Sequence, residues 1–435
     1  MKTNKLGLLA VEGLEDPVPA APASEAFAPD KTDEHLMRAD VVNAEYAHDH
    51  RAHEELGEAA STLCGIHQEL STKALSDGLS EPVAQALNAA IEHLVARSRI
   101  SARVNMSLEG YGGRMARCES TKVALESISG FIKVAIEKLL SWLKGVMVYL
   151  LDGMEELMQG ADRVAERARE VMNKAREIAH KSIRPDGTQL DSPYLTRYFT
   201  HAGALIAPDD LVKTYDGYTK LMGADFSTFL KEMTSQINDA AVDAAKGDTK
   251  DETLDKSNHL LSTLKARAFA HFTEDSKAAS HEVLSYSLPF GQQTILATLS
   301  KEADKYVGLK VQLDRTKVAP KVVNAEKLGT LNYDQIMAVG QAVEKEMLFG
   351  LYKDYQKTKT ELQRIEKAVT RNCGNITRKQ QNTASGDNSV VTYSVNFLKE
   401  IVSATIAMTT IVHRYDIILS KALLEYCTQS IKMHA

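Results

Sequence analysis

The chain has 435 residues, 44% of them hydrophobic, which is enough to build two or three domains with apolar cores. Aromatic residues make up only 6%, with a single tryptophan, Trp142, and Ala, Leu, Glu and Lys are plentiful, a composition that favours helices over sheets. The formal net charge is −6, and the four cysteines form no CxxC pair, so we expect a reducing compartment without a zinc site or a disulfide framework.

No segment of the sequence predicts secretion or membrane insertion. The apolar stretch from Leu6 is interrupted by Glu12, which makes it too short for the core of a signal peptide. Residues 131–151 contain four charged side chains, and the apolar run 401–412 is twelve residues long. Both differ from the span of about 20 uncharged residues that a bilayer requires, so we expect buried or amphipathic helices and no membrane.

Charge divides the chain at about residue 109. Residues 1–109 carry nine basic and eighteen acidic side chains, against 43 and 40 in the remainder. Residues 1–33 read as a disordered acidic Pro/Ala leader. Residues 34–109 read as a helical, acidic, propeptide-like segment, in which Ser76-Asp77-Gly78 breaks the helix and Ser80-Glu81-Pro82 restarts it.

The strongest periodic signal follows a glycine-rich break at residues 110–113. Apolar residues then alternate steps of four and three over six heptads, which predicts a helix about 65 Å long whose stripe packs on a partner helix. We assign this helix to residues 110–183. Its first part, called the seam below, consists of Ile136, Leu140, Leu143, Met147, Leu150, Met154 and Leu157; the stripe continues through Ala161, Val164, Ala168, Val171, Ala175 and Ile178.

The rest of the chain predicts a mixed region and a helical pair. Within 184–340, the alternation at 307–313 predicts a half-buried strand, 194–200 a weaker strand, and 246–256 an exposed loop. Heptad runs at 348–369 and 397–422 predict an antiparallel pair within 341–435, on which the long helix docks. The predicted fold class is mainly α, an elongated bundle of long helices with coiled-coil-like heptad seams and a small inserted β-hairpin or sheet.

No catalytic motif or cofactor site is evident. The sequence contains no GxxxxGK[ST] or GxSxG, and no strand-following GxGxxG. The densest group of metal-ligand side chains is His48, Asp49, His50, His53 and Glu54, but its order differs from HExxH, which favours a solvated helix face. We therefore expect no enzyme, no metal and no cofactor.

One basic run is a candidate for non-specific contact with DNA phosphates. Basic and acidic side chains alternate along 162–181, a pattern typical of an exposed, salt-bridged helix face. The run further on has fewer acidic neighbours and consists of Lys310, Arg315, Lys317, Lys321 and Lys327.

Three features coincide at the end of the acidic segment: the change of charge, the glycine-rich joint, and the tripeptide Ser107-Leu108-Glu109 followed by Gly110. In this combination the chain resembles the inner-head proteins of giant tailed phages of the phiKZ type. The resemblance extends through the long helix, where Ala124-Leu125-Glu126-Ser127 lies near its start. It implies a virion structural protein whose N-terminal propeptide is removed by a prohead protease that cuts after Ser/Ala/Gly-X-Glu. The tripeptide recurs in the chain, and Glu12, Glu15 and Glu25 are other accessible candidates.

The leading hypothesis is therefore an internal head protein, made in the host cytoplasm and packed with DNA inside the capsid. Its expected partners are copies of itself or other virion proteins through the helical seams, the prohead protease, and packaged DNA. An α-helical pore-forming protein, with 131–151 as its apolar segment, is the alternative from another class. A metal-dependent enzyme that uses the histidine cluster is the third.

Overall fold

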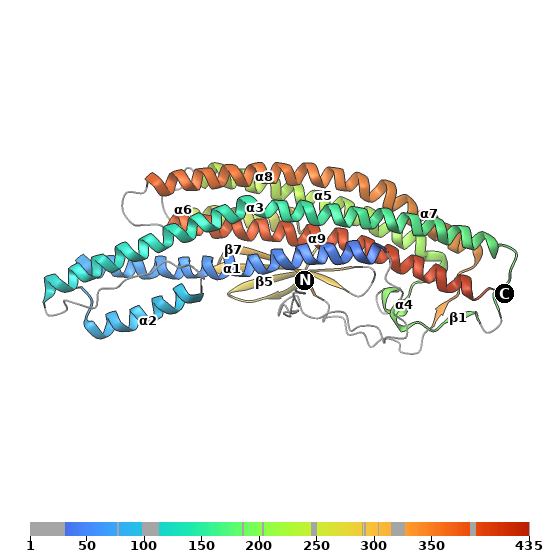
Figure 1. The fold of residues 1–435 in the computed structure, drawn as a ribbon, viewed down its shortest axis with the longest axis horizontal. Helices are drawn as coiled ribbons and strands as arrows, with labels where there is room; N and C mark the ends of the chain where they lie inside the picture. The colour runs from blue at the N-terminus through green and yellow to red at the C-terminus, as the bar shows by residue number, and fades with distance from the viewer. Residues whose placement is uncertain are drawn as a thin grey trace, which may run out of the picture.

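The computed structural model describes residues 31–75, 78–97, 113–184, 187–201, 204–244, 250–288, 290, 293–302, 304–314, 327–382 and 389–434. These residues form an elongated bundle in which long helices run side by side along the major axis (Figure 1). The N-terminal part of the bundle comprises α1 (Lys31–Leu75), α2 (Glu81–Arg97) and α3 (Arg114–Glu177). The mainly α fold class is confirmed.

The predicted breaks fall where these helices end. Between α1 and α2, Gly78 has φ +68° and lies against the backbone of Arg117 and Cys118, so a Cβ at this position would have no room. The N–H of Leu79 donates to Thr121 Oγ1 at 3.2 Å, which fixes the turn to the start of α3. Glycine at this position therefore serves both the turn and the close approach of the chain.

The segment after α3 is compact and mostly helical. Two-stranded pairs form between β1 (Gln189–Leu190) and β8 (Leu328–Gly329), and between β2 (Thr200–His201) and β3 (Ala204–Leu205). The helical elements in this part of the chain are α4 (Pro193–Tyr198), the 3₁₀ turn η2 (Pro208–Asp210), α5 (Leu211–Ala244) and α6 (Lys250–Arg267).

Two local predictions in this region are wrong. Residues 193–198 form α4 instead of a strand, because Pro193 suits the first helical turn and Thr196 Oγ1 donates to the carbonyl of Ser192 at 2.9 Å. The predicted loop 246–256 is helical from Lys250. Asp251 and Glu252 lie in the first turn, where their negative charges stabilise the helix by interacting with the positive end of its dipole.

A four-stranded antiparallel sheet is inserted between α6 and α7. Its strands follow chain order, β4 (Thr273–Lys277), β5 (His281–Ser287), β6 (Thr294–Glu302) and β7 (Lys305–Asp314). The predicted strand 307–313 lies within β7. The sheet packs on α6 and α9 through β7, and it contributes Leu284, Ile295, Ala297, Leu299, Leu309 and Val311 to the hydrophobic core.

The C-terminal part closes the bundle. It comprises α7 (Tyr333–Lys345), the π-helical turn η3 (Glu346–Gly350), α8 (Leu351–Asn382) and α9 (Ser389–Lys432). Asn332 caps α7 reciprocally with Gln335, which explains the sharp start of that helix. The helices α8 and α9 run in opposite directions, and α3 packs on both (Figure 1). One continuous hydrophobic core includes residues of every long helix and of the sheet.

Candidate functional site

All seven seam residues are buried, with exposed fractions between 0 and 4%. They lie on α3, whose neighbours are α1, α7, α8 and α9 of the same chain. Near the end of α3 the packing is close, because Gly340 of α7 lies against Met172 and the carbonyl of Ala168. Since the chain's own helices cover the seam, we correct the expectation that a second copy or another virion protein binds there. Such partners would have to use another surface.

The histidine cluster lies between α1 and α3. His53 stacks on Trp142 with ring centroids 5.0 Å apart, Tyr46 stacks on the same ring at 6.4 Å, and His50 meets its edge at 5.8 Å. His50 Nε2 also lies 2.8 Å from Ser403 Oγ of α9. The prediction of a solvated helix face is therefore wrong for His50 and His53, which pack in the interface, while His48 remains exposed.

The environment of these two histidines favours their neutral form. Burial lowers the pKa of His50 to about 4, against the attraction of Glu54 and with the help of Lys399 and Lys310. Burial also lowers the pKa of His53. Within the described ranges, no group of three or more His, Cys, Asp or Glu side chains is arranged to hold a metal ion. The cluster is thus a packing interface that connects α1 to α3 and α9.

The predicted DNA-contact residues are only partly described. Lys310 is exposed on β7, and Lys327 Nζ forms an ion pair with Asp191 Oδ2 at 3.2 Å. Arg315, Lys317 and Lys321 lie outside the described residues, as do all four residues of the predicted processing site, Ser107, Leu108, Glu109 and Gly110. That site falls between the last residue of α2, Arg97, and the first residue of α3, Arg114.

Sequence reasoning missed a group of carboxylates inside the C-terminal part of the bundle. Asp416 of α9 is 8% exposed, and its Oδ1 has no hydrogen-bond partner among the described residues. Burial and the nearby Glu346 raise the pKa of Asp416 to about 8. Burial, followed by Asp354 of α8 and Asp216 of α5, raises the pKa of Glu346 to about 7.

Glycines make room for these acids. The Glu346 carboxylate lies over Gly350, in the π-helical turn η3, and Asp354 Oδ2 would be 2.9 Å from a Cβ at Gly223 of α5. In the sequence, Asp416 is one of five Lys, Arg, Asp and Glu residues within the heptad run 397–422. One such residue also fits an exposed position, so the pattern alone does not reveal burial.

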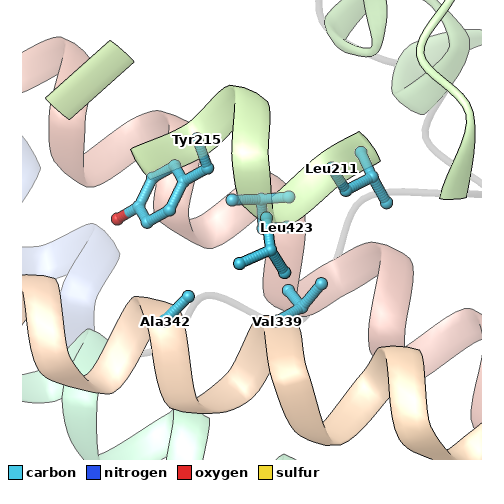
Figure 2. A pocket seen from close by; sticks show the side chains of 6 residues that line it. Leu211, Tyr215, Val339, Ala342 and Leu423 are labelled. Carbon is cyan, nitrogen blue, oxygen red and sulfur yellow. The ribbon is translucent and has the colours of Figure 1, made fainter. Parts of the chain in front are cut away.

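The surface hollow in Figure 2 lies where α5, α7 and α9 meet. It is lined by Leu211, Val212, Tyr215, Val339, Ala342 and Leu423 and leaves no room for a water-sized molecule. Its walls are aliphatic, apart from the Tyr215 hydroxyl, which bonds to Ser420 Oγ at 2.7 Å. This hollow offers no group for chemistry on a ligand.

One described helix is long and apolar enough to cross a bilayer, and it is α9 rather than the segment 131–151 considered above. In its most apolar 18-residue window, 67% of the residues are buried within the bundle. Such burial is what the central helix of a water-exposed bundle requires. The apolarity of α9 is therefore explained by its place in the core (Figure 1).

Together, these observations describe a helical bundle with one continuous hydrophobic core, in which polar clusters connect helices to one another and the described residues form no metal site. The comparison with known families then identifies it. The model of the phiKZ-like phage internal head proteins matches residues 42–429, and the chain belongs to this family. Searches of curated proteins and of solved structures gave no match. The family places the chain among the virion structural proteins of the phage head interior, and the resemblance drawn from the sequence is confirmed.

Proposed function

We propose that this internal head protein is made in the host cytoplasm as a precursor, is cut after Glu109 by the phage prohead protease, and is packed with DNA in the capsid as a body that begins at Gly110. The family match over residues 42–429 carries the structural role in the head. The position of the cut rests on the sequence. Ser107-Leu108-Glu109 coincides with the change of charge and with the glycine-rich joint.

The arrangement of the helices supports this position for the cut. Proteases act on exposed backbone that can adopt an extended conformation. In the sequence, the Glu109–Gly110 bond lies between Arg97, the last residue of α2, and Arg114, the first residue of α3. The chain also contains an internal comparison, because Ala124-Leu125-Glu126 fits the same tripeptide rule but lies within α3. We expect cleavage at the first site and none at the second.

Labelling of protein N-termini in purified particles tests the proposal. The expected result is a new N-terminus at Gly110 and none at Ser127. Replacing Glu109 by Gln in the phage should leave an uncut chain, and Glu126→Gln, as the matched control, should leave processing unchanged. Particles in which this protein keeps an N-terminus upstream of Gly110 would contradict the proposal, including particles cut only after Glu12, Glu15 or Glu25.

The proposed contact with DNA rests on charge. Residues 1–109 carry nine basic and eighteen acidic side chains, whereas the body from Gly110 carries 43 basic and 40 acidic ones. A slightly positive body is better suited to lie against packaged DNA. Of the five basic residues proposed to touch phosphates, Lys310 is exposed, whereas Lys327 is paired with Asp191.

Binding of the body to double-stranded DNA at several salt concentrations tests this contact. The triple change Arg315→Glu, Lys317→Glu and Lys321→Glu should weaken binding and make its salt dependence less steep, by roughly one unit of slope for each phosphate contact that is lost. The control is Lys353→Glu, which reverses one exposed charge on α8, far along the chain from the basic run. An unchanged slope in the triple variant would refute the contact.

A further inference from the structure

The first helix is bound along much of its length. The helix α1 packs along α3 and α9, and Figure 1 shows it lying beside both over a large part of the bundle. Its buried apolar residues recur from one end to the other as Ala39, Leu56, Ala59, Ala60, Leu63, Cys64 and Leu70. A segment with such a stripe loses apolar contacts wherever it is lifted away.

Polar contacts fix the register of α1 on its neighbours. His35 Nδ1 lies 2.9 Å from Glu156 Oε2 of α3, and the Tyr149 hydroxyl of α3 donates to Asp49 Oδ2 at 3.2 Å. Further along, Asn396 Nδ2 of α9 donates to Ser61 Oγ at 2.8 Å. Because these contacts are spread over 26 residues, or about 39 Å of helix, sliding α1 by one turn would break all of them.

Close backbone approach adds to this specificity. A Cβ at Gly57 of α1 would lie 2.5 Å from Asn396 Oδ1, so that α9 approaches α1 as closely as glycine permits. Near the other end of the interface, Gly160 of α3 faces His35, where a Cβ would be 3.6 Å from His35 Cβ, an ordinary van der Waals contact. The interface therefore combines buried apolar residues with specific polar contacts, although Asn396 Oδ1 and Trp142 Nε1 are buried without a hydrogen-bond partner among the described residues.

From these contacts we infer that α1 is held on α3 and α9 by its own interface, so that a chain cut between α2 and α3 keeps its N-terminal fragment as a non-covalent subunit. The surface formed by α3 and α9 is then a docking site, and its occupant is α1 of the same chain. Cutting the connection removes only the advantage of a high local concentration. The inference rests on the proposed function for its role in the virion, because the proposed processing is what would cut the chain there. The binding of α1 itself does not depend on which protease makes the cut.

The experiment uses the full chain with a sequence-specific protease site in place of residues 104–109. After complete cutting at neutral pH, size-exclusion chromatography should show both fragments in one peak at equal amounts. The chain also carries its own reporter, because its single tryptophan, Trp142, is 7% exposed and is covered by Tyr46, His50 and His53 of α1. Its fluorescence maximum should not move on cutting. Separate elution of the fragments, or a red shift to the emission of water-exposed tryptophan, would overturn the inference.

Two matched variants show whether the interface is what holds the fragment. Leu63→Asp places a carboxylate at a position that is 0% exposed, and Val41→Asp places one on the same helix at a position that is 57% exposed. After cutting, the first should release the fragment at least 100-fold more readily, and the second should behave like the unchanged sequence. The milder Leu63→Ala, with at least tenfold easier release, replaces the first if it fails to fold. Equal retention in the buried and exposed variants would overturn the inference.

The retention of α1 and the proposed processing would be contradicted by different results. If particles contain only uncut chain, the processing after Glu109 is wrong, but the engineered cut still measures the binding of α1. If the fragments separate in vitro while particles contain a body that starts at Gly110, the processing stands and the retention of α1 is wrong.

Discussion

Two buried clusters of ionisable side chains in the same bundle respond to pH in opposite directions. At the interface of α1 with α3, burial lowers the pKa of His50 and of His53, so the folded protein favours their neutral forms. Where α9 meets η3, burial raises the pKa of Asp416 and of Glu346, so the folded protein favours the neutral carboxylic acids. Both clusters lose stability when they become charged, but the histidines do so as the pH falls and the carboxyl groups as it rises.

The comparison separates the binding of α1 from the integrity of the C-terminal core. Acid should weaken the contact of α1 with the rest, whereas alkali should weaken the packing of α9 against α5. At neutral pH the histidines are in the neutral form that the fold favours, whereas the carboxyl groups are only partly protonated. Although the two regions share one continuous core, a change of pH in one direction or the other therefore destabilises one of them and not the other.

The largest effect is expected from charge in the core that both regions share. Leu143→Asp and Leu150→Asp replace seam residues that are 0% and 4% exposed, and each should cost about 3–5 kcal/mol, a large part of the free energy of unfolding. The matched control is Val148→Asp on the same helix, at a position that is 53% exposed, where we expect a cost below about 1 kcal/mol. Thermal unfolding followed by circular dichroism measures both. Similar melting temperatures for the three variants would mean that the seam is not part of the core.

The carboxylate cluster should yield an effect that grows with pH. An acid whose pKa is raised on folding is protonated in the folded state while it is ionised in the unfolded state, so its stability contribution falls as the pH rises from its unfolded value of 3.8 to its folded value of about 8. Asp416→Asn removes this penalty. The variant should equal the original chain near pH 4 and exceed it by about 1–3 kcal/mol at pH 8.

Urea unfolding at a series of pH values measures this difference. The control is Asp152→Asn, which changes an exposed acid on α3 and should give a difference that does not depend on pH. An Asp416→Asn variant that is less stable than the original chain at pH 8 would show that the carboxylate is favourably solvated or paired, contrary to the burial described above.

The long helices could be predicted because their signals are local and repeat many times. The seam runs through several turns of α3, and the end of α1 is marked by Ser76-Asp77-Gly78. The strand β7 was visible because Val311 and Leu309 alternate with the exposed Lys310 and Gln312. Each of these patterns is decided by which face of an element is buried, and the sequence records that directly.

The strand β5 was hidden because a charged residue occupies one of its buried positions. Glu282 of β5 is 0% exposed, and it is paired with Lys265 and accepts a hydrogen bond from the Tyr306 hydroxyl at 2.6 Å. Glu282 and Leu284 lie on the same buried face of the strand, so this face does not show an apolar pattern in the sequence. Its partners lie 17 and 24 residues away along the chain, so only the fold brings them together.

The same limit applied to the candidate sites. The histidines on α1 resembled a solvated group because nothing in their own helix indicates that Trp142 and Ser403 cover them. The raised pKa of Asp416 likewise depends on its burial among neighbouring helices and on the charge of Glu346, which is far away in the sequence. A single sequence shows which residues are able to titrate, but the packing of distant elements decides their pKa.

The smallest expected change in stability concerns the histidine interface, where the acid response of α1 can be measured directly. A histidine whose pKa is lowered on folding contributes stability that is complete above its unfolded value of 6.5 and is lost as the pH falls toward its folded value of about 4. The charged groups that face His50 are Glu54 and His53 of α1, Lys399 of α9 and Lys310 of β7, and of these only Glu54 favours the protonated form. Acidification from pH 7 to pH 4.5 should therefore weaken α1 binding by about 1–2 kcal/mol.

His50→Gln should remove much of that dependence, because an amide does not titrate and can still reach Ser403. His48→Gln, at a histidine whose side chain is 71% exposed on the same helix, should leave it unchanged. The measurement is Trp142 fluorescence in the chain cut between α2 and α3, titrated from pH 7 to pH 4.5 at several protein concentrations. Release of the fragment exposes the indole and gives a concentration-dependent red shift, whereas general acid unfolding gives a shift that is independent of concentration. If both glutamine variants follow the original curve, the acid response of α1 originates elsewhere and the opposition between the two clusters is wrong.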